Sequence, residues 1–342
     1  MRRALAAAAL LTSIAGFAGA QDVHWKSEFL FYLDNTEFST PYRDGETILG
    51  AWFKTYLELA TGGNTHVKAG VFGDHRSGDT KFLNPVKPIL AFLWQSDRSL
   101  AVLGALEPRD RHGYLEPLEA TTLELTRPIE YGLQWVENQK RFHIDAYLNW
   151  QHLNTTQSRE ILDTGFAAWW NPVGIARLEG QLHWLHHGGQ LHAVGPVTNN
   201  IVGGPGFRLE DELKGLGRAS FSAFYLLSTG PVAMDQGGES ITGNGVYLKA
   251  SAEPARLFEL AFIFWRGHNF ITHEGDHNYG SIGATPPFYR ADRRYEELAL
   301  IKKFRIAGTV DADAQVRLHH IDGKLEYSYR LAVRAPFDIK IH

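Results

Sequence analysis

The chain has 342 residues, a formal net charge of −4 and no cysteine. The slightly acidic balance gives no general attraction to nucleic acid, and without cysteine the fold depends on packing and backbone pairing instead of disulfides. No stretch after residue 20 reaches the roughly 18 consecutive apolar residues of a membrane helix, so a membrane could be spanned only with strands.

The first twenty residues have the pattern of a secretory signal peptide. Arg2 and Arg3 precede an apolar run at 4–17, and Ala18-Gly19-Ala20 forms an A-x-A cleavage site. We therefore expect residues 1–20 to be removed and a mature chain to begin at Gln21, outside the cytoplasm. An uncleaved membrane anchor is the alternative.

From residue 23 onward, segments in which apolar and polar residues alternate are separated in turn by tight turns and long polar loops. Such alternation is typical of β-strands, because successive side chains point to opposite faces of a sheet. In the first third of the chain, strands are predicted at 23–33, 52–59, 66–71, 89–95 and 100–106, followed by a loop at 107–119. Further strands are predicted at 123–135, 142–151, 159–170, 176–184, 207–213, 221–227, 246–250, 258–264, 289–304, 310–319 and 325–341.

The last two strands give the clearest signal. They alternate without a break on both sides of Asp322-Gly323, a dipeptide that favours a two-residue hairpin turn. The second of them is far longer than the five or six residues usual in soluble sheets. Aromatic residues also gather near the strand ends, as in the girdles of membrane barrels: Trp135, Trp150, Trp169, Trp170, Trp184, Trp265 and Tyr289.

In these features the chain resembles Gram-negative outer-membrane β-barrel proteins of porin size. The resemblance implies an all-β, transmembrane antiparallel β-barrel of about 16 strands (14–18), formed by 21–342 as one domain, with short periplasmic turns and long extracellular loops. It implies location in the bacterial outer membrane, with membrane lipid and the barrel-assembly machinery as partners. A soluble periplasmic β-sandwich that binds sugar is the alternative.

The polar face of the predicted strands carries charges of both signs. About sixteen strands enclose too wide a lumen for side chains to fill, so a watery passage is expected unless loops plug it. The side chains predicted to line this lumen are Lys54, Glu58, His66, Lys68, Glu124, Glu130, His143, Asp145, Arg159, Asp163, Arg177, Glu179, His183, Asp311, Asp313, Arg317, Glu326, Arg330 and Arg334. They suit a filter for polar solutes, and a ladder of salt bridges that only stiffens the wall is the alternative.

Two groups of histidines stand out in loops. His186, His187 and His192 enter a long loop that could fold back to narrow a pore, with exposed loop histidines as the alternative. His273-Glu274-Gly275-Asp276-His277 matches H-E-x-x-H by letters, but a central glycine opposes the helix that this zinc motif needs. A looser metal site formed by His268, His273, Asp276 and His277 competes with a hydrated loop, so neither metal nor cofactor is predicted.

A membrane-embedded hydrolase would need a nucleophile, a base and an orienting group at adjacent positions. Ser220, Ser222 and Ser328 have no nearby histidine in their own strands. The sequence therefore favours a porin-like channel for small hydrophilic solutes or a polar, saccharide-like polymer, and predicts that the protein is not an enzyme. An outer-membrane barrel enzyme, or an adhesion protein with a plugged lumen, is the alternative.

Overall fold

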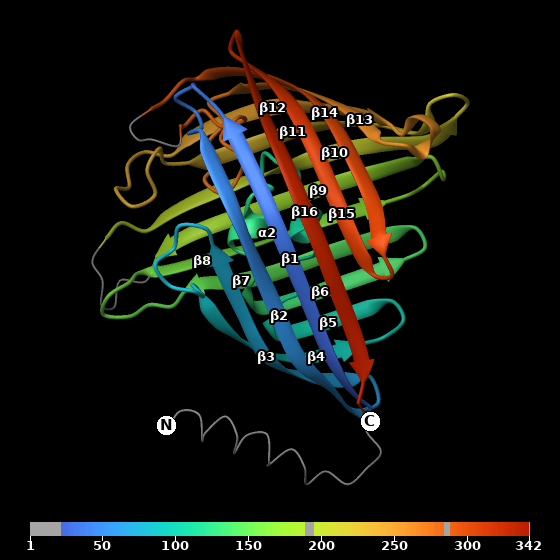
Figure 1. Ribbon diagram of the computed structural model, residues 1–342. Helices are drawn as coiled ribbons and strands as arrows, with labels where there is room; N and C mark the ends of the chain where they lie inside the picture. The colour runs from blue at the N-terminus through green and yellow to red at the C-terminus, as the bar shows by residue number, and fades with distance from the viewer. Residues whose placement is uncertain (1–21, 189–194, 284–287, 342) are drawn as a thin grey trace.

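The computed structural model describes residues 22–188, 195–283 and 288–341, and their strands form one closed antiparallel barrel (Figure 1). Each strand pairs with the next along the chain, and β1 closes the barrel against β16. The strands are β1 Val23–Glu37, β2 Glu46–Gly62, β3 Thr65–Arg76, β4 Val86–Gln95, β5 Ser99–Ala105, β6 Tyr131–Gln139, β7 Phe142–His152, β8 Glu160–Trp170, β9 Ala176–Gly188, β10 Thr198–Leu213, β11 Gly217–Gly230, β12 Ile241–Ala252, β13 Glu259–His268, β14 Asp292–Ala307, β15 Val310–Ile321 and β16 Lys324–Lys340. The predicted barrel of about sixteen strands is confirmed.

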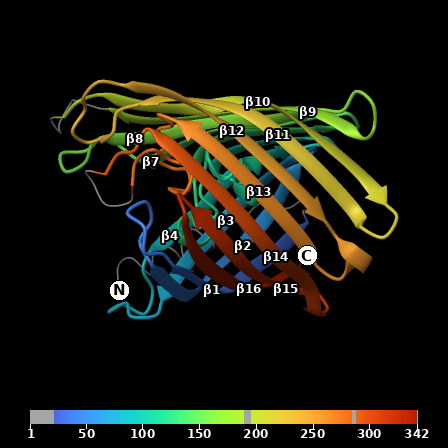
Figure 2. The ribbon, with the colours of Figure 1, turned by 90° about the horizontal axis from the view of Figure 1, so that it is seen from above.

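The two ends of the barrel differ in their connections. β1 begins beside the end of β16, since His24 is the register partner of Lys340, and the short turns other than Asp322-Gly323 lie at this end. We call it the turn end, and the opposite end, with most of the long connections, the loop end (Figure 2). In bacterial barrels the short turns face the periplasm and the long loops face outward. The predicted signal peptide, residues 1–20, lies outside the described residues.

One predicted strand is wrong in its first half. Residues 123–126 form the short helix α2 (Leu123–Thr126), and β6 begins only at Tyr131. Pro128 has no backbone N–H to donate to a neighbouring strand. Leu125 packs inside the barrel and is only 2% exposed. Its apolar character reflects this packing and not a place on a strand. The apolar residues at 123–129 therefore lie in a segment that folds into the barrel.

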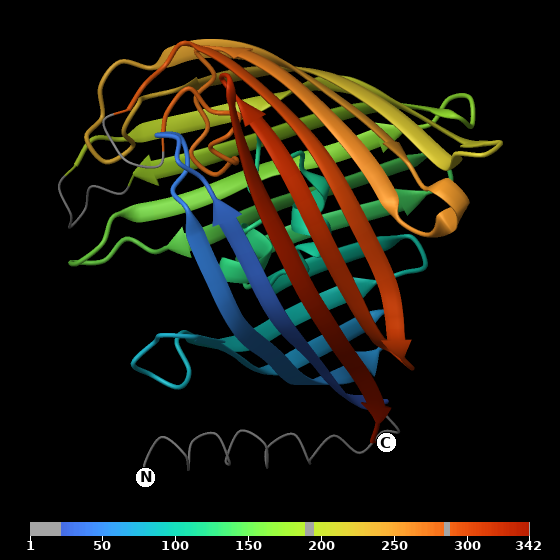
Figure 3. The ribbon, with the colours of Figure 1, turned by 45° about the horizontal axis from the view of Figure 1, so that its top comes forward.

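Residues 106–130 leave β5, enter the lumen and return to β6 (Figure 3). They contain the 3-10 turn η2 (Arg109–Gly113) and α2, and we call them the lumen segment. The connection between β13 and β14 folds inward against it, with backbone hydrogen bonds from Ala120 N–H to Glu274 O (2.8 Å) and from Asp276 N–H to Glu116 O (2.9 Å). A Cβ on Gly275 would lie 2.1 Å from Pro117 O, so this crossing needs glycine.

The aromatic girdle is observed only in part. Trp135, Trp150, Trp170, Trp184 and Tyr289 are exposed on the protein surface, as expected for interfaces with lipid. Trp265 is fully buried inside the barrel, where its indole N–H donates to Tyr279 O (3.0 Å), and Trp169 stacks on the inward-facing Arg177. These two were wrongly assigned to the girdle because their strand positions point to the lumen.

Candidate functional site

Most of the predicted lumen residues lie at inward-facing positions of their strands and form a network of ion pairs. Arg334 bonds both Glu28 of β1 and Glu124 of α2, and Glu28 also pairs with Lys54 (2.9 Å). Arg330 pairs with Asp34 at 2.5 Å and donates to Thr121 of the lumen segment. The charged face predicted from the sequence thus holds the lumen segment against the wall.

The remaining predicted lumen residues lie in three different parts of the fold. Glu124 and Glu130 lie on the lumen segment instead of a strand, because the predicted strand 123–135 starts late. Arg159 precedes β8 at the loop end, 3.9 Å from Asp235. The other positions, on inward faces of strands, are Glu58, His66, Lys68, His143, Asp145, Asp163, Arg177, Glu179, His183, Asp311, Asp313, Arg317 and Glu326.

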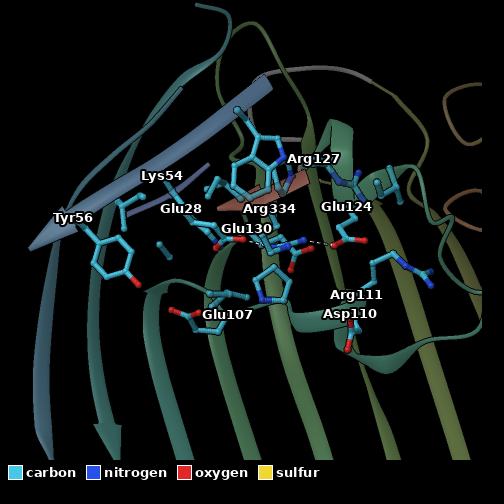
Figure 4. A pocket seen from close by; sticks show the side chains of 18 of the residues that line it. Glu28, Lys54, Tyr56, Glu107, Asp110, Arg111, Glu124, Arg127, Glu130 and Arg334 are labelled. Atoms are coloured by element: carbon cyan, nitrogen blue, oxygen red, sulfur yellow. Dashed lines mark hydrogen bonds and ion pairs between the residues drawn. The ribbon is translucent and has the colours of Figure 1, made fainter. Parts of the chain in front are cut away.

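Two cavities lie on the turn-end side of the lumen segment. One, of about 480 Å³, is bounded by Lys54 and Tyr56 on one side and by Arg111 and Arg127 on the other (Figure 4). The other, of about 670 Å³, extends along β14–β16. Residues of the lumen segment line both cavities and lie between them and the loop end.

His112 anchors the lumen segment to the barrel wall. Its ring lies flat on Tyr147, with centroids 3.7 Å apart, and its two nitrogens are 3.0 Å from Glu130 and 3.1 Å from Asp145. Burial opposes a charge on the imidazole, but hydrogen bonds and attraction from the two carboxylates outweigh it and raise the pKa of His112 to about 10. An imidazolium therefore holds this turn of the segment.

Glu119, in the same segment, predicts a pH dependence of stability. Burial, with repulsion from Glu130, raises the pKa of its carboxyl to about 7. The folded chain then binds more protons than the unfolded chain between the ordinary and the raised pKa, so stability falls as pH rises through this window. We expect the free energy of unfolding to fall between pH 5 and pH 8 by about 1–3 kcal/mol more in the wild type than in Glu119→Gln.

Urea unfolding in detergent at both pH values measures this difference. Both proteins keep His112, so its contribution to the free energy of unfolding is the same in each. The difference between the two proteins therefore reports on Glu119. Equal losses of stability in the two proteins would contradict the assignment.

A serine and a histidine meet on the inner wall near the loop end. The Nε2 of His319, on β15, lies 2.8 Å from Ser328 Oγ, on β16. On the other side of the ring, Nδ1 is 2.7 Å from the hydroxyl of Tyr295, which donates to Glu297 Oε2 at 2.6 Å. We call Ser328, His319, Tyr295 and Glu297 the serine relay.

The hydrogen bonds of the serine relay run in one direction. Tyr295 donates to Glu297, so its oxygen accepts from Nδ1–H of His319, and Nε2 is left to accept the Ser328 hydroxyl proton. Arg317 holds the Glu297 carboxylate by its other oxygen, with 2.8 Å between Arg317 Nη1 and Glu297 Oε1. A hydroxyl facing an unprotonated imidazole nitrogen is the arrangement that activates a serine nucleophile.

The serine relay is covered on the side of the loop end. His319 and Ser328 are 2% and 7% exposed, and the ring of Phe38 lies 5.0 Å from the imidazole. Ser39 donates from its backbone N–H and its hydroxyl to Glu326 Oε1, two residues from Ser328. A cavity of about 20 Å³ beside the relay is large enough for one water molecule.

Sequence reasoning considered Ser328 but missed its partner, which lies on the neighbouring strand. The signal was available: a two-residue turn at Asp322-Gly323 pairs Ile321 with Lys324 and thus Arg317 with Ser328. His319 is then one inward-facing position away from Ser328 on the adjacent strand.

The predicted histidine groups do not converge on a ligand. His186 points outward and bonds Asn199 Oδ1 (2.8 Å), His187 lies 3.2 Å from Asp235, and His192 lies outside the described residues. His273 bonds Pro231 O (2.9 Å), whereas Asp276 pairs with Arg43 (2.7 Å). The two side chains therefore have different partners. Burial lowers the pKa values of His273 and His277.

The residues His268, His273, Asp276 and His277 therefore do not form the looser metal site considered above. Among the described residues, no group of three or more His, Asp or Glu side chains is arranged to hold a metal ion. No helix in the described part of the chain is both long and apolar enough to cross a membrane.

Comparison with solved structures supports the fold. The loop L8 deletion mutant of OmpT, an outer membrane protein of Vibrio cholerae, superimposes with a TM-score of 0.58 at 10% identity, covering 93% of this chain and 100% of that one. An anion-selective porin from Comamonas acidovorans gives 0.53 at 12% identity over 93% and 99% of the two chains. OccAB1 of Acinetobacter baumannii gives 0.52 at 9% identity over 96% and 98%. At these identities the likeness establishes an outer-membrane β-barrel fold alone.

A search of curated proteins gave no match. A family model described as lipid A 3'-O-deacylase-type matches residues 17–341, nearly the whole chain. This match points to an enzyme, so the prediction that the protein is not one is wrong. The histidine that contacts Ser328 lies on the neighbouring strand and not in the strand of the serine itself. The chain belongs to the lipid A 3'-O-deacylase-type family.

Proposed function

We propose that the protein is an outer-membrane hydrolase that removes an ester-linked acyl chain from a phosphoglycolipid of the lipid A class. The observation that carries the proposal is the serine relay, in which Ser328 Oγ lies 2.8 Å from an imidazole whose other nitrogen is oriented by Tyr295 and Glu297. The family description supports the substrate class and the ester bond.

The geometry supports acyl transfer through a covalent intermediate. Ser328 Oγ attacks the ester carbonyl as His319 Nε2 takes its proton, and the same proton then passes to the leaving sugar hydroxyl. Water next attacks the acyl-serine, His319 takes one water proton and returns it to Ser328, and the fatty acid leaves. Tyr295 and Glu297 stabilise the imidazolium that forms in each half of the reaction.

Arg317 is positioned to stabilise the charge that develops on the ester oxygen. It is the register partner of Ser328 across β15 and β16, and both residues border the small cavity beside the serine relay. Three of its N–H groups bond Glu297 and Gln315, and a guanidinium has five, so two remain for an oxyanion.

The lipid would reach Ser328 from the loop end, where the outer leaflet lies. Phe38 and Ser39 stand in this path, so we propose that the residues 38–45 move aside when the lipid binds. The lumen segment fits this function better than an open channel, because it closes off the relay from the turn end.

The test is to incubate detergent-purified protein with lipid A and to follow the lipid by mass spectrometry. The proposal predicts the loss of one ester-linked acyl chain and the release of the matching fatty acid. Intact lipid A, together with steady single-channel currents from the same preparation, would support a channel instead.

Tyr295 gives a prediction that separates positioning from substrate binding. Tyr295→Phe removes the hydroxyl that joins His319 to Glu297, and we expect kcat to fall by about 10- to 100-fold with KM unchanged. The rate should also become more dependent on pH, because the imidazolium loses its orienting partner. Tyr147→Phe is the matched control, since the hydroxyl of Tyr147 donates to Asp163 (3.1 Å) in the same lumen but on β7 and β8, across the barrel from the serine relay. Equal effects of the two substitutions would show that Tyr295 is only structural.

A further inference from the structure

Two arginines lie directly opposite each other on the outer wall of the barrel, near the loop end of β13 and β14. Arg266 is the register partner of Arg294, and both side chains are exposed. Their strand neighbours Trp265 and Tyr295 point into the lumen, so the two arginines point outward. Like charges directly opposite on one face of a sheet destabilise each other, so a counter-charge between them would stabilise this part of the wall.

Among the residues that the structure describes, only one of these two arginines has a counter-charge. Arg294 pairs with Glu296 (2.6 Å), and Glu296 also contacts His320 (2.9 Å). Asp292 pairs with His268 (2.8 Å). Within 22–188, 195–283 and 288–341, no carboxylate lies within ion-pair distance of Arg266. The Arg266 guanidinium is therefore an uncompensated cation on an outer wall.

The wall beside these arginines, toward the middle of the strands, is apolar. Phe262, Leu298 and Leu300 are 46%, 44% and 45% exposed on the same outer face. A lipid is a ligand that combines an anionic head with apolar chains, and an arginine fork matches a phosphate group in geometry and charge.

We propose that Arg266 and Arg294 bind the phosphate group of a lipid of the outer leaflet, with the acyl chains of that lipid lying along Phe262, Leu298 and Leu300. The loop end faces this leaflet. The site lies on the outer wall and does not depend on the serine relay, which faces the lumen.

Ether-linked phosphatidic acid is the probe, because it has no acyl ester to cleave, and the matching dialkylglycerol differs from it only by the phosphate. Full-length folded protein in neutral detergent is titrated with each lipid, and bound lipid is counted by native mass spectrometry. Arg266→Gln is expected to weaken phosphatidic acid binding by about fivefold. Arg256→Gln, which removes the same charge from the exposed turn end, is the control and should leave binding unchanged.

Three results would overturn the proposal. They are equal binding by Arg266→Gln and wild type, equal binding of dialkylglycerol and phosphatidic acid, and displacement of the lipid by equimolar inorganic phosphate, which would indicate a free-anion site. Heat-modifiable gel migration of both variants verifies that they are folded barrels.

Discussion

Replacement of Ser328 by alanine is expected to lower the rate of ester hydrolysis by about 10⁴-fold. The substitution removes the oxygen that attacks the ester and leaves His319 with no proton to take. Members of such a relay act as a unit, so His319→Gln should cause a loss of similar size, and the double variant should be no slower than either. The rate of fatty acid release from lipid A measures all three.

Ser222→Ala is the matched control for this prediction. Ser222 is also buried on the inner wall, 5% exposed, but no histidine contact is observed for it among the described residues. It should retain the wild-type rate. Each variant must show heat-modifiable migration, so that loss of activity is not loss of the barrel. Full activity in Ser328→Ala would exclude Ser328 as the nucleophile.

Removal of two ion pairs inside the barrel is expected to open the lumen. Arg127 donates hydrogen bonds to Glu274 from two nitrogens (3.1 and 2.6 Å), and Arg43 donates one to Asp276 (2.7 Å). These pairs join the lumen segment and residues 38–45 to the inward connection between β13 and β14. Both pairs are partly buried, so removal of the arginine leaves a partly desolvated carboxylate without its charged partner, and the segments should then separate into water.

The double variant Arg43→Ala/Arg127→Ala is therefore expected to raise single-channel conductance in planar bilayers by about tenfold or more over the wild type. Arg218→Ala, which breaks an exposed pair with Glu210 at the turn end, should leave conductance unchanged. Unchanged conductance in the double variant would mean that the other contacts of the lumen segment, including those of Arg330, Arg334 and His112, are enough to keep the lumen closed.

The barrel could be predicted from the sequence because each strand repeats one local rule. Outward apolar and inward polar residues alternate, and Asp322-Gly323 fixes a register that the structure reproduces in β15 and β16. The same rule failed at residues 123–129, because apolar residues that pack inside a lumen can have the same spacing as a strand. It also placed Trp265 in the girdle, since an aromatic residue near a strand end can face either side.

The candidate site could be predicted only in part. His319 follows from the hairpin register, but Tyr295 and Glu297 lie on β14, whose pairing with β15 contains an irregularity between Arg305 and Ala307. Such a bulge shifts the register by an amount that alternation does not reveal. The inward course of residues 106–130 depends on contacts with residues more than a hundred positions away, such as Glu274. Local patterns carry no information on such contacts.

The measurement that tests the central claim most directly is covalent labelling of the full-length folded protein with a small alkyl fluorophosphonate, which reacts with activated serines. The modified residue is located by peptide mass spectrometry. We predict a single adduct on Ser328, lost in His319→Gln and formed more slowly in Tyr295→Phe. Cleavage of lipid A by a protein that carries no adduct on Ser328 would contradict the account.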